Sequence, residues 1–139
     1  MTLLAKIFRC DCPVTSAVDI VGDKWTLVVI KLMLLEQKKT FKEFSESDES
    51  IAPSILSNRL KTLEKTEFII KVKPKDNKKT NHYFLTEKGF SLTPVIIELA
   101  LWSHNNIKPI NDEELLKVKD KNEMHQILVE RYKLKTATL

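Results

Sequence analysis

Small polar and basic side chains share one side of the segment from Pro53 to about Lys65 when it is drawn as a helix. At 100° per residue the three leucines, Leu56, Leu60 and Leu63, fall within roughly 60° of one another. The polar set clusters opposite them: Ser54, Ser57, Asn58, Lys61 and Lys65. Asparagine pairs bidentately with adenine, serine donates or accepts, and lysine reaches guanine or phosphate. Such side chains on a helix surface are more often simply solvated, so the pattern alone leaves both interpretations open.

Positive charge is concentrated in the middle of the chain. From Pro53 to Lys88 there are nine basic residues against four acidic ones, whereas Thr40 to Ala52 holds one lysine against four acidic residues. The whole chain carries a net charge of +4. A basic stripe confined to one segment is typical of a protein whose partner is rich in phosphate. The alternative is a solvated lysine-rich face.

Two cysteines near the N-terminus could support thiol chemistry. Cys12 precedes Pro13 at an expected helix start, where backbone N–H groups and the helix dipole lower a thiol pKa. Cys12 is therefore a possible thiol sensor, and Cys10 is a possible resolving thiol. A bridge between Cys10 and Cys12 of one chain would close too small a loop, which favours an intersubunit disulfide. The alternative is a small residue that only packs.

Metal binding and catalysis find little support. Cys10-x-Cys12 is tighter than zinc spacing, and His82, His104 and His125 show no paired spacing, so we expect no metal site. No phosphate loop, Gly-x-Ser-x-Gly or His-Glu-x-x-His motif is present. We therefore expect neither an enzyme nor a cofactor. A Cys–His hydrolase built on Cys12 is the remaining catalytic alternative.

Length and composition limit the remaining classes. A chain of 139 residues has room for one domain with a single core and one or two added helices. Its longest apolar run, Leu27 to Leu35, is too short for a bilayer, and Met1 to Phe8 does not resemble a signal peptide. We expect a cytoplasmic protein without membrane association, in which the cysteines are normally reduced.

The hydrophobic pattern predicts the elements that position these residues. A short helix begins at Pro13, and a second, capped by Asp23, starts at Lys24 and is apolar nearly all round, as in the centre of a core. Thr40 and Glu43 form a capping box for a short helix that buries Phe41 and Phe44. The polar turn 45–50 then leads to the helix that begins at Pro53.

The second half of the chain predicts a hairpin and two more helices. Segments 68–73 and 81–85 alternate apolar and polar residues around a basic, turn-rich tip. Thr86 or one of its neighbours caps a helix that continues through Pro94 to Trp102, and Asn111 with Glu114 starts a last helix to about Tyr132. Trp25 and Trp102 lie on apolar faces and are expected in the core.

This order of elements is that of a winged helix-turn-helix, a mainly α fold with a small β-hairpin wing (α+β). A helix fits the major groove of DNA, and its outward side chains can contact base edges. The hairpin lysines would lie over the phosphate backbone, where they add affinity without reading sequence. We assign residues 1–110 to DNA binding and dimerisation and residues 111–139 to a C-terminal helical extension.

Successive motifs between Cys12 and Trp102 resemble those of the HxlR branch of the MarR-like regulators. They are Cys12-Pro13-Val14, Gly22-Asp23-Lys24-Trp25-Thr26-Leu27, Thr40-Phe41-Lys42-Glu43-Phe44, Ile55-Leu56-Ser57-Asn58-Arg59-Leu60, Leu63-Glu64, Tyr83-Phe84-Leu85-Thr86, Gly89, Leu92-Thr93-Pro94-Val95 and Trp102. The resemblance implies a homodimeric transcription regulator whose dimer contacts come from the first helix and from Val95 to Trp102. It also implies that many members repress their own gene or control a stress-response gene, often through an N-terminal cysteine at the position of Cys12.

The chain departs from this family pattern at three places. Ala52 stands where a capping residue is usual before the proline, and Ser50 is the expected replacement. Glu67 stands where the family has glycine, and a left-handed conformation there costs roughly 1 kcal/mol. The wing tip is Lys-Asp-Asn-Lys-Lys-Thr instead of a proline-rich turn.

We therefore predict a regulator that binds duplex DNA at specific sequences and acts as a repressor. The alternative is a winged-helix module that binds protein instead of DNA. The predicted partners are a near-palindromic operator and a second copy of the chain, with a small-molecule or oxidant effector left open. The predicted DNA-binding residues are Pro53, Ser54, Ser57, Asn58, Arg59, Lys61, Lys73, Lys75, Lys78 and Lys79.

Overall fold

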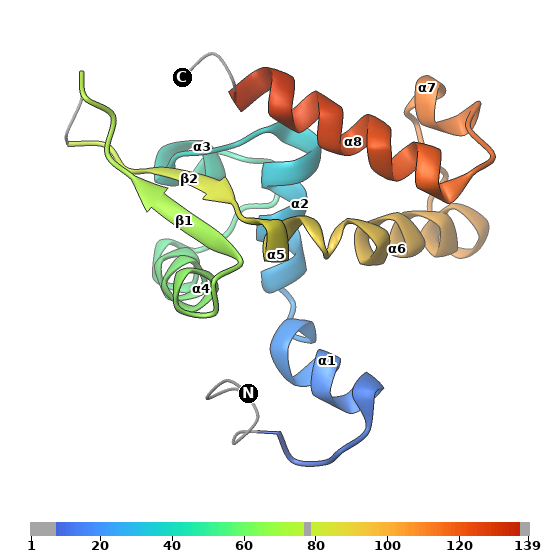
Figure 1. Ribbon diagram of the computed structural model, residues 1–139, viewed down its shortest axis with the longest axis horizontal. Coiled ribbons are helices and arrows are strands. Elements are labelled where there is room, and N and C mark those ends of the chain that lie inside the picture. Colours follow the sequence, from blue (N-terminus) through green and yellow to red (C-terminus); the bar gives the residue numbers. More distant parts are fainter. Residues whose placement is uncertain (1–7, 77–78, 137–139) are drawn as a thin grey trace.

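The computed structural model describes residues 8–76 and 79–136, which form a mainly helical fold with one two-stranded antiparallel sheet (Figure 1). The elements are α1 (Pro13–Val21), α2 (Thr26–Glu36), α3 (Phe41–Ser45), α4 (Pro53–Lys65), β1 (Ile69–Val72), β2 (His82–Leu85), α5 (Glu87–Phe90), α6 (Thr93–Asn106), α7 (Glu113–Leu116) and α8 (Lys121–Thr136). The predicted mainly helical fold with a hairpin wing is confirmed.

Helix α2 runs through the centre of the molecule (Figure 1). Five of its side chains are at most 1% exposed: Val29, Ile30, Leu32, Met33 and Leu34. Helices α6 and α8 and strand β2 pack against it. The prediction of a buried central helix is confirmed, but the helix begins at Thr26, two residues later than Lys24. The Asp23 carboxylate nonetheless accepts hydrogen bonds from the amides of Trp25 and Thr26, as expected of the predicted capping residue.

Helix α3 begins with the predicted capping box. Thr40 Oγ1 accepts a hydrogen bond from the Glu43 amide, and the Glu43 carboxylate accepts one from the Thr40 amide, each at 3.1 Å. Phe44 is fully buried as predicted, but Phe41 is 37% exposed. The prediction for Phe41 was wrong because this end of α3 faces a surface groove that Tyr83 also lines.

The ends of α4 follow two different rules. Pro53 occupies the first turn, where its missing N–H costs nothing, and Ala52 precedes it. The expectation that Ser50 caps α4 was wrong, because Ser50 adopts a left-handed conformation (φ 54°) and within the described chain no side chain caps this end. Glu67 is left-handed as expected (φ 66°). Its amide bonds the Glu64 carbonyl at 3.1 Å, and the next amide bonds the Leu63 carbonyl at 2.9 Å, which is a Schellman motif.

The wing is the hairpin of β1 and β2, in which Ile69 pairs with Leu85 and Val72 with His82. Ile69 and Leu85 are buried against the body, whereas Ile70 and Val72 point outward and are exposed. Helix α5 packs at the root of the wing through Gly89. A Cβ at that position would lie 2.3 Å from the Phe68 carbonyl oxygen, so only glycine permits this approach.

Two predicted helices are each broken in two. The helix expected from Thr86 to Trp102 is α5 followed by α6, because the chain turns at Ser91 and Leu92 and restarts at Thr93 with Pro94 in the first turn. The helix expected from Asn111 to Tyr132 is α7 followed by α8. Its first cap is Asp112, whose carboxylate accepts a hydrogen bond from the Leu115 amide.

The expectation that both tryptophans lie in the core is wrong for Trp102, whereas Trp25 packs against the core cluster. Trp25 is only partly buried, and Trp102 on α6 is 59% exposed. No helix in residues 8–76 and 79–136 is long and apolar enough to cross a membrane.

Candidate nucleic-acid interface

Helix α4 presents the predicted polar side chains to solvent. Ser54, Asn58 and Lys61 are exposed and Ser57 is partly exposed, while the leucines of the opposite side are buried. Pro53, at the start of the helix, is exposed as well. Helix α4 lies directly below β1 at one end of the molecule, after α3 and the turn 46–52 (Figure 1). The structure therefore brings the predicted base-contacting face and the wing to the same end.

Arg59 lies in this group but is engaged within the protein. Its Nε donates to Asp23 Oδ1 at 2.9 Å, and its Nη1 donates to Asn58 Oδ1 at 2.8 Å. The side chain is 29% exposed. Asp23, Arg59 and Asn58 thus form a chain of polar contacts that runs from the start of α2 to the exposed face of α4. The geometry makes Arg59 a support for the Asn58 amide.

The Asp23 carboxylate anchors this chain. Oδ1 accepts from the amides of Trp25 and Thr26 at 2.8 and 2.9 Å, and Oδ2 accepts from the Thr26 hydroxyl. Partial burial by itself raises the pKa of Asp23, but hydrogen bonds from Thr26, Trp25 and Arg59 outweigh it and lower the pKa from 3.8 to about 2. Asp23 is therefore ionised at neutral pH and holds both the start of α2 and Arg59.

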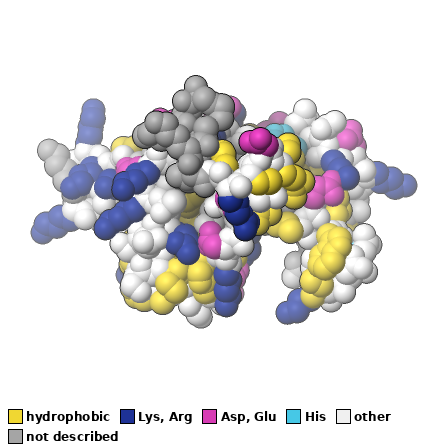
Figure 2. All heavy atoms as spheres, turned by 90° about the horizontal axis from the view of Figure 1, so that it is seen from below, with side chains coloured by type: hydrophobic (Ala, Val, Ile, Leu, Met, Phe, Trp, Pro, Cys, Tyr) yellow, Lys and Arg dark blue, Asp and Glu magenta, His cyan; other side chains and the backbone are white. Residues whose placement is uncertain are grey.

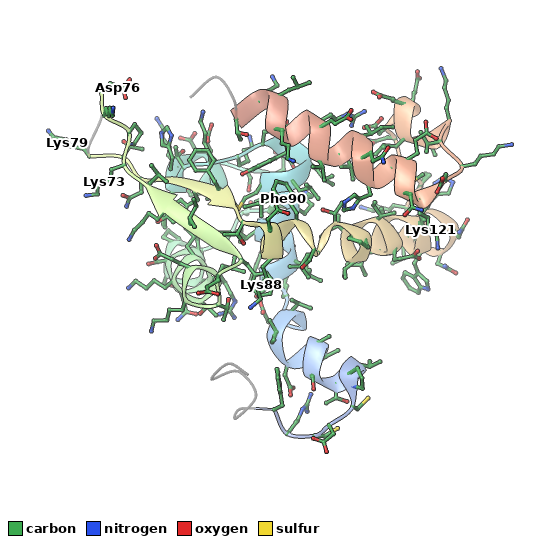
Figure 3. All side chains as sticks on the ribbon, viewed as in Figure 1. Lys73, Asp76, Lys79, Lys88, Phe90 and Lys121 are labelled. Carbon is green, nitrogen blue, oxygen red and sulfur yellow. The ribbon has the colours of Figure 1, made fainter. Side chains whose placement is uncertain are left out.

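The wing carries exposed lysines away from the body. Lys73, Lys75 and Lys79 are exposed on either side of its tip, and Lys78 lies outside the described residues. Lys and Arg side chains gather at the end formed by the wing and α4 (Figure 2), and Lys73 and Lys79 lie on the projecting hairpin (Figure 3). This basic end of the molecule can meet a phosphate backbone while α4 faces the bases.

Two lysines of the basic segment 53–88, Lys88 and Lys71, make contacts within the protein. Lys88 donates to the Thr66 carbonyl at 2.8 Å and lies over the Phe68 ring, 4.7 Å from its centroid. Lys71 lies 3.9 Å from the Glu64 carboxylate. These two lysines tie the root of the wing to the end of α4, so charge counting alone overstated the positive surface.

Cys12 and Cys10 are both exposed and unbridged. Hydrogen bonds from the amide and hydroxyl of Thr15 and from the Val14 amide lower the pKa of the Cys12 thiol. Those groups belong to the first turn of α1, as predicted from the position before Pro13. The Cys12 backbone amide also donates to the Cys10 sulfur at 3.2 Å.

Helices α1 and α6 border an open apolar groove. None of the residues of α1, all of which the structure describes, is buried, and the helix stands away from the body (Figure 1). Val14 and Val18 of α1 are 72% and 49% exposed, and Leu99 of α6 is 49% exposed. The groove is lined by Pro13, Val14, Ala17, Val18, Ile20, Val21, Leu27, Phe68, Leu92, Val95 and Leu99, together with Gly22, Lys88 and Ser91.

The order α3, turn, α4 and wing, with α4 packed beside a hairpin whose tip carries exposed lysines, matches a known family. The model of the HxlR-like helix-turn-helix family matches residues 20–111, more than half of the chain. The chain belongs to the HxlR-like helix-turn-helix family. This HxlR-type chain is thus a winged helix-turn-helix transcriptional regulator that binds double-stranded DNA, and the alternative of a protein-interaction module is not favoured.

Individual relatives agree with this assignment. The HTH-type transcriptional regulator YodB of Bacillus subtilis (strain 168) is 32% identical over 99 residues, covering 70% of this chain and 88% of YodB. The solved structure of reduced YodB aligns with a TM-score of 0.58 and 31% identity, covering 73% of this chain and 100% of that one. The redox regulator HypR in its oxidized form aligns with a TM-score of 0.61 and 28% identity, covering 68% of this chain and 97% of HypR.

Sequence reasoning missed two parts of this site. The pairing of Asp23 with Arg59 joins residues 36 positions apart, and no local pattern predicts it. The hydroxyl of Tyr132, near the C-terminus, accepts a hydrogen bond from the Leu85 amide of β2 at 2.9 Å. The spacing of Met124, Leu128 and Tyr132 every four residues signals a buried helix face, but it does not identify the strand that this face meets.

Proposed function

We propose that this HxlR-type regulator recognises its operator through α4 and binds the flanking backbone through its wing. Ser54, Ser57, Asn58 and Lys61 contact base edges, and Arg59 holds the Asn58 amide in place. Pro53 forms the first turn of α4, at the end of the helix that we place at the major groove of the DNA. Lys73, Lys75, Lys78 and Lys79 contact phosphates. The single observation that carries the proposal is the exposed polar face of α4 beside the basic wing.

The test begins by sequencing the duplex fragments that the purified protein selects from a random library. Asn58→Ala and Ser57→Ala should then relax the selected sequence, since a bidentate base contact contributes ~1–3 kcal/mol of discrimination. Lys73→Ala with Lys75→Ala should instead weaken binding to every duplex and flatten its dependence on salt. Identical profiles for the two kinds of variant would refute the assigned roles, and binding that hardly responds to salt would favour the protein-interaction module.

The proposed regulator is a homodimer, and its two copies meet through the groove between α1 and α6. Exposed apolar side chains on both helices support this, because such a face is costly in water unless a partner covers it. A two-fold dimer presents two α4 helices about one DNA turn apart, ~34 Å, to a near-palindromic operator. A monomer mass by light scattering at micromolar concentration would contradict the dimer. Leu99→Lys, which puts a charge into the groove, should shift the mass toward the monomer.

Cys12 is proposed as a thiol sensor and Cys10 as its resolving partner. YodB has been solved in quinone-bound and diamide-treated forms, and HypR is described as a redox regulator. The Cys12 thiolate would add to a ring carbon of a quinone: one S–C bond forms, one ring C=C π bond is lost as its electron pair moves to a carbonyl oxygen, and that oxygen takes a proton from water. An oxidant would take two electrons and two protons from two thiols of different subunits and leave a disulfide. Either product lies beside α1 and would alter the spacing of the two α4 helices.

The sensor proposal is tested by comparing operator binding before and after a quinone or mild oxidant. Wild type, Cys12→Ser and Cys10→Ser are treated in parallel, and modification is verified by mass. Lower affinity in the wild type but not in Cys12→Ser is the expected result. If a protein modified at Cys12 binds its operator with unchanged affinity, Cys12 has only a packing role. If the loss of affinity disappears only in Cys10→Ser, the sensor is Cys10.

The remaining assignments complete the proposal. Residues 1–110 form the DNA-binding and dimerisation domain, and residues 111–139 form a helical extension. The regulator acts as a repressor in the cytoplasm, where bacterial DNA lies. A reporter gene placed behind a selected operator should lose expression when the protein is present.

A further inference from the structure

The C-terminal helix α8 lies beyond the segment that the family model matches, which ends at residue 111. It is nonetheless part of the core. Met124, Leu128 and Tyr132 are 7%, 3% and 4% exposed, and the helix packs against both α2 and α6. Arg131 pairs with Asp112 and Glu114 at 2.8 and 2.6 Å and thereby ties α7 to α8. The extension is therefore firmly attached to the DNA-binding domain.

The last buried residue of α8 reaches the wing. The Tyr132 hydroxyl accepts a hydrogen bond from the Leu85 amide at 2.9 Å. Leu85 is the final residue of β2, and the following residue, Thr86, caps α5. The Tyr132 ring also meets Phe90 of α5 edge to face, with centroids 5.3 Å apart, and Phe90 lies in the middle of the body (Figure 3). Tyr132 thus lies where the wing leaves the body.

The position of this hydrogen bond determines its effect. Strand β2 has β1 on one side, and alternate amides of β2 point to the other side. Two of these outward amides find acceptors in the body: the Tyr83 amide bonds the Lys39 carbonyl at 2.7 Å, and the Leu85 amide bonds Tyr132. A buried amide without an acceptor is costly in free energy. Loss of the Tyr132 hydroxyl would therefore let this end of β2 shift until the Leu85 amide finds another acceptor.

We propose that α8 is a brace that fixes the orientation of the wing relative to α4, with Tyr132 as the positioning residue. DNA affinity contributed by the wing lysines then depends on a hydroxyl group that lies 47 positions after Leu85 in the chain. The inference rests on the proposed role of the wing in phosphate binding. Burial raises the pKa of the Tyr132 phenol, while the hydrogen bond from the Leu85 amide works against that rise.

The test uses Tyr132→Phe, which removes the acceptor and keeps the ring against Phe90. Leu134→Ala is the matched control, because it changes the same helix at a side chain that is 75% exposed. The first measurement is hydrogen exchange of the Leu85 amide. We expect exchange about tenfold faster in Tyr132→Phe, with the amides of α2 and the control variant unchanged.

The second measurement is binding to a mixed-sequence duplex of 30 base pairs at several salt concentrations. We expect Tyr132→Phe to bind several-fold more weakly and its salt slope to fall by about one, as after loss of a lysine contact. In a background carrying Lys73→Ala and Lys75→Ala the substitution should have little further effect, because its action passes through the wing. A general structural defect would instead weaken both backgrounds equally.

The outcomes separate this inference from the proposed function. Unchanged affinity and salt slope in Tyr132→Phe, with a wild type that binds the duplex in a salt-dependent way, would overturn the brace and leave DNA binding intact. An equal loss in both backgrounds would also overturn it. A wild type that shows no salt-dependent binding would refute the proposed function itself, whatever the exchange rate of Leu85.

Discussion

Replacing Asp23 by asparagine or alanine tests how the start of α2 and helix α4 are held together. Asp23→Ala removes the acceptor for the amides of Trp25 and Thr26 and the partner of Arg59. Loss of a helix-capping acceptor costs about 1 kcal/mol. A partly exposed ion pair adds up to about 1 kcal/mol. We therefore expect Asp23→Ala to lower the free energy of unfolding by about 2 kcal/mol at neutral pH.

Asp23→Asn removes the negative charge but keeps the capping interaction, because asparagine remains a good acceptor for helix amides. It therefore isolates the electrostatic contribution of Asp23 to stability. The pKa of Asp23 falls from 3.8 to about 2 on folding, which corresponds to about 2.4 kcal/mol at 1.36 kcal/mol per unit. The Asp23 side chain is 33% exposed, so solvent screening reduces this to about 1 kcal/mol. Since the folded pKa is the lower one, this stability is complete above pH 3.8 and is lost as the pH falls toward 2.

The assay is urea denaturation of wild type and Asp23→Asn at pH 6 and at pH 3. We expect the wild type to be more stable by about 1 kcal/mol at pH 6 and by roughly half of that at pH 3. Asp48→Asn, an exposed acid in the turn after α3, controls for removal of one negative charge. A stability difference that stays constant between the two pH values would refute the electrostatic account. No difference at pH 6 would refute the anchoring role of Asp23 altogether.

Two further predictions concern the root of the wing. Gly89→Ala should lower the free energy of unfolding by about 1–3 kcal/mol, because the new Cβ would meet the Phe68 carbonyl at 2.3 Å. An unchanged urea midpoint would contradict that close approach. Glu67→Gly should raise stability by about 0.5 kcal/mol, because glycine adopts the left-handed conformation (φ 66°) without strain. Thermal unfolding measures this, and a lower Tm would show that the Glu67 side chain makes a compensating contact.

Local patterns predicted much of the fold correctly. The capping box at Thr40, the start of α4 at Pro53 and the left-handed Glu67 each depend on residues within a few positions of one another. The breaks after α5 and after α7 were missed, because both segments keep a helical apolar pattern across the interruption. A turn at Ser91 and Leu92 lets α5 pack on the wing while α6 runs toward α8, and this choice is made by tertiary contacts.

The site divides in the same way between local and distant interactions. The exposed face of α4 follows from its own periodicity, so Ser54, Asn58 and Lys61 could be predicted. What holds that face and the wing in place comes from elsewhere in the chain. Asp23 reaches Asn58 through Arg59, and Tyr132 reaches β2 across 47 positions. Hydrogen bonds of this kind leave no periodic trace, because a single acceptor at the right place is enough. The exposed face of α4 can therefore be predicted from helix geometry, whereas the residues that hold this face and the wing in place emerge only when the chain is folded.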